Sequence, residues 1–280
     1  MTDGAGEDHR QFSLGLLRGA GGALIFGIPM LMTMELWFIG FYMPRERLFL
    51  LLLVNIPLLV VLARRIGFEN TFSWRQAMRD AMIAYALAIV TSGLVLVLFG
   101  VLTLDMPVRE WVGKIALQSV PASIGAMLGR SQLGQPDEEE EDEEKGGQLN
   151  TGYAGELFMM AIGALFLCLN VAPTEEIILI SFKMSAWHAL AAIAASLIIM
   201  HGFVYAVSFR GTHQLNEHTP RWHALIRFTF PGYIVACLIS LYVLWTFGRL
   251  DDTAWTQVMM SMVVLNAPGA LGAASARLIL

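Results

Sequence analysis

The chain alternates between long apolar runs and short polar stretches. Each run is close to the ~20 residues with which a helix crosses the hydrocarbon core of a bilayer. The pattern therefore predicts an all-α polytopic membrane protein. Its eight transmembrane helices are expected at residues 17–43, 48–63, 81–104, 112–129, 154–182, 185–209, 225–247 and 256–280.

Prolines fall inside several of these runs. A proline removes one backbone hydrogen bond from a helix, so a span that contains one can be kinked or broken. We predict helix breaks at Pro29, Pro121, Pro173 and Pro268.

The second half of the chain repeats the first. Three matching blocks occur in the same order, at shifts of 141, 148 and 147 residues, which indicates a duplicated unit. We expect an N-terminal cytoplasmic tail (1–16), a first four-helix repeat (17–130), an acidic cytoplasmic linker (131–153) and a second four-helix repeat (154–280). Representative pairs are Gly22 with Gly163, Thr33 with Thr174, Glu35 with Glu176, Tyr85 with Tyr233, Gly100 with Gly248 and Pro121 with Pro268.

Composition supports a membrane location. The chain is 56% hydrophobic and 15% charged, which is unlike a soluble domain. The net charge of −5 is local, because residues 137–144 are all acidic and the remainder is slightly basic. Such a run predicts a solvated linker, and the alternative is a low-affinity sensor of divalent cations. We expect no nucleic-acid partner and no cofactor.

Orientation follows from the positive charges. With an even number of spans both termini share a side, and placing them in the cytoplasm puts twelve Lys and Arg residues inside and six outside. The two repeats then run in parallel. The first 15 residues are polar and do not resemble a cleaved signal peptide.

Two glutamates lie inside predicted spans. Glu35 and Glu176 are matching residues, each seven positions before the outer end of its span, so each lies ~10 Å below the outer surface. An unpaired carboxylate there is costly, and each must face a partner, water or a cation. One interpretation is that the repeat axis brings the two together in a cation site. The other is structural pairing, with Arg45, Arg47 or Lys183 within reach.

The second copy carries additional oxygen ligands. Asn170, Thr174 and Glu175 surround Pro173, which frees the carbonyl of Leu169. Neutral oxygens beside carboxylates are what a hard cation prefers.

The first copy is simpler at the same place. It has Pro29, Thr33 and Glu35, and Met34 stands where the second copy has its additional acid. The two half-sites are therefore expected to be unequal.

Small residues and one histidine complete the candidates. Gly125-x-x-x-Gly129 and Gly272-x-x-x-Ala276 predict close packing of the fourth and eighth spans against a neighbouring helix or another subunit. His201 is expected to be a hydrogen-bonded packing residue rather than a proton carrier.

The segment Asn170-Val-Ala-Pro173-Thr174-Glu175-Glu176-Ile177, in a chain with an acidic central loop, resembles an uncharacterised family of bacterial integral membrane proteins known as a domain of unknown function. The resemblance covers most of residues 12–280. It implies the bacterial inner membrane and no established activity. By architecture alone, the chain is similar to lysosomal potassium channels, whose two parallel repeats also place a recurring motif on their first helices.

The same segment is also similar to the Glu-Glu motif of the prenyl-protein (CAAX) protease family, which implies an intramembrane hydrolytic site. That family places an arginine four residues after the second glutamate, where this chain has Ile180, and the Phe-x-x-x-His motif of its second helix is absent. Catalysis would leave Glu35 without a role.

The sequence thus favours a cation channel or transporter. Glu35, Glu175 and Glu176 would bind an inorganic cation with help from Thr33, Thr174 and Asn170, and a homodimer would complete a ring of carboxylates. The alternatives are a glutamate-dependent metalloprotease-like enzyme and a structural membrane protein.

Overall fold

The computed structural model describes residues 3–66, 73–133, 153–208 and 225–279. All secondary structure in these residues is helical. The chain divides into two compact units, Met1–Glu141 and Asp142–Leu280, which are described separately. The acidic run 137–144 lies outside the described residues.

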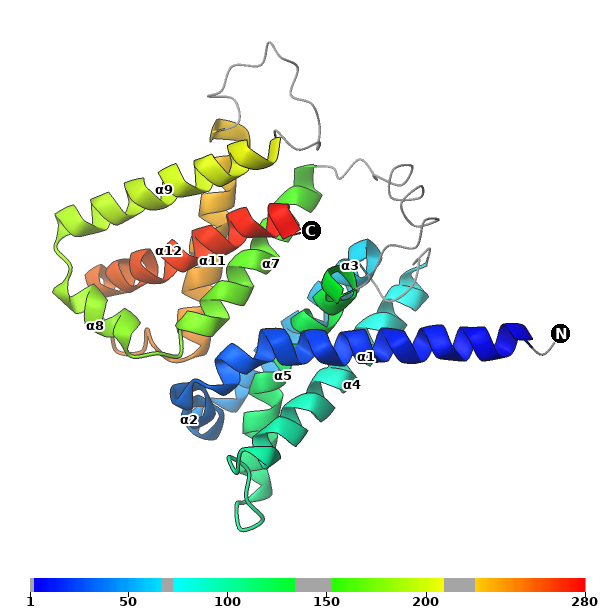
Figure 1. Ribbon diagram of the computed structural model, residues 1–280. Helices are drawn as coiled ribbons and strands as arrows, with labels where there is room; N and C mark the ends of the chain where they lie inside the picture. Colours follow the sequence, from blue (N-terminus) through cyan, green and yellow to red (C-terminus); the bar gives the residue numbers. More distant parts are fainter. Residues whose placement is uncertain (1–2, 67–72, 134–152, 209–224, 280) are drawn as a thin grey trace. The chain divides into compact units, whose positions relative to one another are not determined.

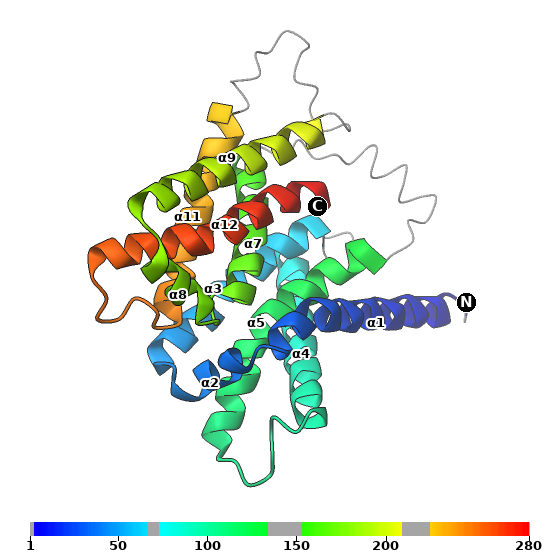
Figure 2. The same cartoon turned by 60° about the vertical axis from the view of Figure 1, so that its left-hand side comes forward.

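The first unit is built around a central helix. It contains α1 (Asp3–Leu31), α2 (Met34–Tyr42), α3 (Arg45–Ile66), α4 (Trp74–Leu98) and α5 (Val108–Leu133). The helix α5 contacts each of the other four (Figures 1 and 2). Residues 117–129 of α5 are all buried, so α5 forms the core of this unit.

The second unit has the same plan. It contains α7 (Tyr153–Val171), α8 (Glu176–Lys183), α9 (Ala186–Ser208), a π-helical turn η1 (Leu225–Thr229), α11 (Phe230–Thr246) and α12 (Trp255–Ile279). The helix α12 contacts α7, α8, α9 and α11, so it holds the place that α5 holds in the first unit.

The small-residue motifs form close backbone contacts between helices in both units. A Cβ atom added to Gly22 would lie 2.3 Å from the carbonyl oxygen of Gly125, and one added to Gly163 would lie 2.1 Å from that of Gly272. The prediction of close packing is confirmed, and the neighbour is the first helix of the same unit. Only residues without a side chain allow backbones to approach this closely.

Seven of the described helices are long and apolar enough to cross a membrane. They are α1, α3, α4, α7, α9, the continuous segment η1–α11, and α12. The fourth predicted span corresponds to α5, which is not among these seven. It is more polar than they are, because it carries Glu110, Lys114 and Gln118. Other helices surround α5, so it does not need an apolar surface of its own.

The first and fifth predicted spans are each divided in two. The chain leaves α1 at Leu31 and re-enters a helix at Met34, and it leaves α7 at Val171 and re-enters at Glu176. It changes direction at both places (Figures 1 and 2). Pro29 lies in the last turn of α1, and Pro173 lies in the second interruption, so both stand where the helix stops.

The predicted breaks at Pro121 and Pro268 are wrong. Pro121 lies inside the continuous helix α5 and Pro268 inside the continuous helix α12. Each proline deletes one backbone hydrogen bond. These are the two central helices, and the helices packed around them hold them together across the missing bond.

The third predicted span begins earlier than its apolar run. The helix α4 starts at Trp74 because Ser73 and Gln76 form a reciprocal capping box, in which the Gln76 amide donates to Ser73 Oγ at 3.3 Å and the Ser73 amide to Gln76 Oε1 at 3.0 Å. The helix α1 likewise begins at Asp3, inside the segment assigned to the tail.

The helices α4 and α11 end in the same way. Gly100 has φ of +69° and Gly248 has φ of +71°, a left-handed conformation that favours glycine. The next amide reaches back five residues in each case, from Val101 to Leu96 and from Arg249 to Leu244, both at 2.9 Å. Each turn places the residue after its glycine against another segment. Arg249 contacts the interruption after α7, and the carbonyl of Val101 faces Lys114 of α5.

Candidate functional site

The interruption in the first unit lies directly before Glu35. Thr33 is extended, and its hydroxyl donates to the carbonyl oxygen of Pro29 at 3.0 Å. Glu35 follows in the first turn of α2, where the positive end of the helix dipole favours a carboxylate. The Glu35 side chain is half-buried.

The interruption in the second unit is longer and richer in polar groups. The Thr174 hydroxyl donates to the carbonyl of Val171 at 2.9 Å, and Asn170 Nδ2 donates to that of Phe166 at 2.7 Å. Asn170 Oδ1 is buried, and none of the described residues donates a hydrogen bond to it. Both neutral side chains thus turn their protons toward the backbone and keep oxygen lone pairs free.

A basic residue that the sequence did not single out for this site holds the second interruption. Arg249 donates a hydrogen bond to the carbonyl oxygen of Pro173 and lies 3.6 Å from Glu175 Oε1. The Arg249 side chain is only 14% exposed, whereas Glu175 is 79% exposed. Because the second partner is mostly solvent-exposed, the bond to the Pro173 carbonyl is the stronger anchor of the guanidinium.

The sequence contained one signal for Arg249. Arg249 directly follows Gly248. The matching residue in the first repeat is Gly100, which ends α4, so a turn was predictable at this point. The distance of 76 residues between Arg249 and Pro173 hid the contact itself. Arg45, Arg47 and Lys183 were considered from the sequence as partners of Glu35 and Glu176, and the contact between Arg249 and Glu175 does not bear on that pairing.

Glu176 begins α8 and is exposed. It occupies the same first-turn position as Glu35 does in α2. The two glutamates belong to different units, and a joint action on one cation stays a prediction.

His201 is a packing residue, as expected. Its Nδ1 atom lies 3.0 Å from Thr229 Oγ1 in the turn η1, and Thr229 is fully buried. Over the ranges that the structure describes, no three side chains of His, Cys, Asp or Glu gather in an arrangement that could hold a metal ion.

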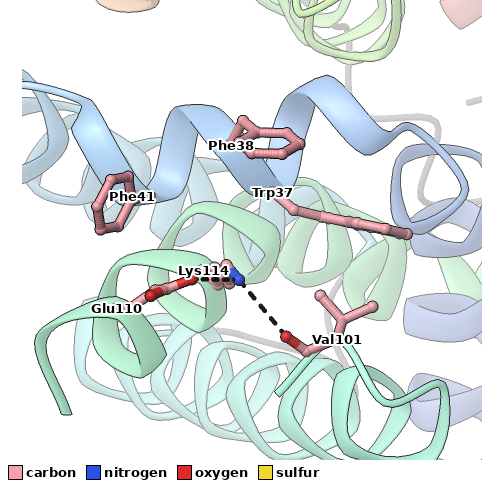
Figure 3. A pocket seen from close by; sticks show the side chains of 6 residues that line it. All are labelled: Trp37, Phe38, Phe41, Val101, Glu110 and Lys114. Atoms are coloured by element: carbon pink, nitrogen blue, oxygen red, sulfur yellow. Dashed lines mark hydrogen bonds and ion pairs between the residues drawn. The ribbon is translucent and has the colours of Figure 1, made fainter. Parts of the chain in front are cut away.

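A second polar location in the first unit lies between α2 and α5. Gly40 of α2 contacts the α5 backbone at Gly113 and Lys114. Lys114 Nζ lies 2.6 Å from Glu110 Oε1, one helical turn earlier. Beside this ion pair is a pocket of about 270 Å³, lined by Trp37, Phe38, Phe41, Val101, Glu110 and Lys114 (Figure 3).

The matching location in the second unit is neutral. Ser181 of α8 replaces Gly40, and the α12 residues Gln257 and Ser261 replace Glu110 and Lys114. Gln257 Nε2 and Ser261 Oγ both donate to Ser181 Oγ, at 2.5 Å and 3.0 Å. The same contact between a short helix and a central helix is therefore charged in one unit and uncharged in the other.

Comparison with known proteins supports the membrane assignment at the level of the family. Searches of curated proteins and of solved structures gave no significant match. Residues 15–280 match the family described as "Putative integral membrane protein (DUF2391)". This match covers nearly the whole chain, including both helix interruptions and both short helices. The chain therefore belongs to the DUF2391 family of integral membrane proteins.

Proposed function

We propose that this protein is a cation channel or transporter of the bacterial inner membrane, in which the two helix interruptions bind the passing cation. The observation that carries the proposal is the buried oxygen Asn170 Oδ1, which lacks a hydrogen-bond donor among the described residues. It lies in the last turn of α7, directly before the interruption that contains Glu175 and is followed by Glu176. A buried acceptor without a donor is costly, and a bound cation satisfies it.

The chemistry of both interruptions suits a hard cation. Glu35 and Glu176 supply negative charge, and Thr33, Thr174 and Asn170 supply neutral oxygens whose protons are already given to backbone carbonyls. Interrupted membrane helices are a recurring way of presenting such ligands within a bilayer. Potassium, sodium, calcium and the proton all remain candidates.

The proposal includes an architecture. Eight spans arise if α5 crosses the bilayer in addition to the seven helices that are long and apolar enough to do so. The equal contact patterns of α5 and α12 and the matching turns at Gly100 and Gly248 support two repeats, which the charge bias orients in parallel with both termini in the cytoplasm. A homodimer would add a second pair of half-sites.

The test is cation flux into liposomes that contain the purified protein, with each of the four cations supplied in turn. We expect Glu176→Gln and Glu35→Gln to lower a wild-type flux by tenfold or more. Glu46→Gln serves as the matched control, because Glu46 is an exposed carboxylate in the first turn of α3. Its flux should equal that of the wild type.

Two results would contradict the proposal. One is a wild-type flux that neither glutamate variant changes. The other is folded protein that passes none of the four cations under any gradient, which would favour a structural role or metal-dependent hydrolysis at Glu175 and Glu176.

A further inference from the structure

The pocket beside Lys114 has the features of a ligand site, and it takes no part in the proposed cation pathway. Three aromatic side chains from one face of α2 form its wall, and the α5 ion pair forms its polar side (Figure 3). At about 270 Å³ it is slightly smaller than the sites that enclose whole drug-sized molecules. It can enclose the polar end of a larger amphipathic molecule.

The polar side of the pocket has donor capacity to spare. Lys114 is 9% exposed and Glu110 is 18% exposed. Apart from Glu110, the contacts of Lys114 Nζ are long, at 3.5 Å to the Val101 carbonyl and 3.8 Å to Met106 Sδ. Trp37 Nε1 is buried and has no acceptor among the described residues. A phosphate has several acceptor oxygens and would accept hydrogen bonds from both Lys114 Nζ and Trp37 Nε1.

The charges of the pocket select against ligands of a single sign. A lone anion would meet the Glu110 carboxylate, and a lone cation would meet the Lys114 ammonium, in a setting where both are largely desolvated. A ligand with both charges is complementary to the pair.

The position of the pocket along α5 points to a lipid. Lys114 lies six residues after Val108, the first residue of α5, and so ~9 Å from the helix end. For a helix that starts at the membrane surface, this depth is near the boundary between the headgroups and the hydrocarbon, where the polar end of a lipid meets its acyl chains. Trp is enriched at membrane–water interfaces, and Trp37 lines this pocket together with Phe38 and Phe41.

The fold does not need this ion pair. The second unit makes the equivalent contact with Gln257, Ser261 and Ser181, all uncharged. A largely buried ion pair adds little stability over neutral groups of similar size. We therefore propose that the first unit binds a zwitterionic phospholipid, with its phosphate at Lys114 and Trp37, its ammonium at Glu110 and an acyl chain along Phe38 and Phe41.

The test is native mass spectrometry of the protein extracted from vesicles of equal parts phosphatidylethanolamine and phosphatidylglycerol. We expect the wild type to retain phosphatidylethanolamine selectively. The variant Glu110→Gln/Lys114→Ser, which copies the neutral chemistry of the second unit, should retain about tenfold less. Arg45→Gln/Glu46→Gln removes a charge pair at the exposed start of α3 and should behave as the wild type.

Equal retention of the zwitterionic lipid by the double variant, or equal retention of both lipids by the wild type, would overturn the proposal. If the double variant does not fold, Trp37→Phe decides, because it keeps the aromatic wall and removes one donor. It should lower retention several-fold, and unchanged retention would refute the site. Neither result depends on whether the protein transports cations.

Discussion

The two helix interruptions are held in different ways. In the first unit the Thr33 hydroxyl caps the carbonyl of Pro29 within the same turn. In the second unit Arg249, brought in by the turn after α11, binds the carbonyl of Pro173 from 76 residues away. One interruption is stabilised by its own segment and the other by a distant part of the unit.

The comparison also concerns charge. The second unit has Glu175 where the first has Met34, and Arg249 where the first has Val101. The additional carboxylate is therefore matched by an additional guanidinium 3.6 Å away. The first interruption has Glu35 and the second has Glu175, Glu176 and Arg249, so each carries a formal charge of −1. Two unequal sequences arrive at the same local charge.

The largest expected effects test whether the two units are packed alike. Gly22→Ala and Gly163→Ala each place a Cβ within 2.3 Å of a facing carbonyl oxygen, which forces a backbone shift. We expect each to lower the free energy of unfolding by about 3 kcal/mol, measured as loss of thermal stability in detergent. Gly202→Ala in α9 is the control, because none of the described residues has an atom within 4 Å of its added Cβ. A large effect in one unit alone would break the comparison.

The next effect concerns Arg249. The change Arg249→Val, which copies Val101, leaves the Pro173 carbonyl without its donor, and we expect a loss of about 2 kcal/mol in the free energy of unfolding. Adding Glu175→Met, which copies Met34, should recover only about 0.5 kcal/mol, because Glu175 is mostly exposed. Chemical denaturation of the single and double variants measures both values. Full recovery would mean that the ion pair, and not the carbonyl, is the main anchor.

A smaller effect is expected at the matching turns. Gly100→Ala and Gly248→Ala each put an L side chain at φ near +70°, which costs about 1 kcal/mol of the free energy of unfolding. Within the described ranges no atom lies within 4 Å of a Cβ added to Gly100, so there the loss comes from backbone strain. A larger loss at Gly248 than at Gly100 would show that the second turn also has a steric requirement.

The smallest effect concerns the loops that follow Gly100 and Gly248, which should differ in how their stability depends on pH. Hydrogen bonds from the Thr103 hydroxyl and from its own backbone amide lower the pKa of Asp105 below the ordinary value of 3.8. Its contribution to stability is therefore present above that value and is lost as the pH falls through the folded-state pKa. Thr103→Val should raise the pKa of Asp105 in an NMR titration. Position 253, which matches Asp105, is a threonine and cannot show this dependence.

The sequence predicted the helices well because the length of an apolar run and the length of a membrane-crossing helix are set by the same bilayer. Its prediction of helix breaks at prolines was right at two positions and wrong at two others. Proline removes one hydrogen bond wherever it stands, and the outcome depends on packing. Pro121 and Pro268 lie in the central helices, which stay continuous, whereas the chain leaves the helix at Pro29 and Pro173. The Arg249 contact could not be predicted because it joins two loops that are distant in sequence.

The backbone contacts between α1 and α5, and between α7 and α12, have a mechanical consequence. Helices that touch without intervening side chains cannot slide or separate without losing that contact, so each pair should behave as a rigid block. The short helices α2 and α8 join these blocks through two and four non-helical residues. We expect motion in each unit to concentrate at these joints, and hydrogen exchange should be fastest there. A ligand that binds at an interruption would then act on the hinge of its unit.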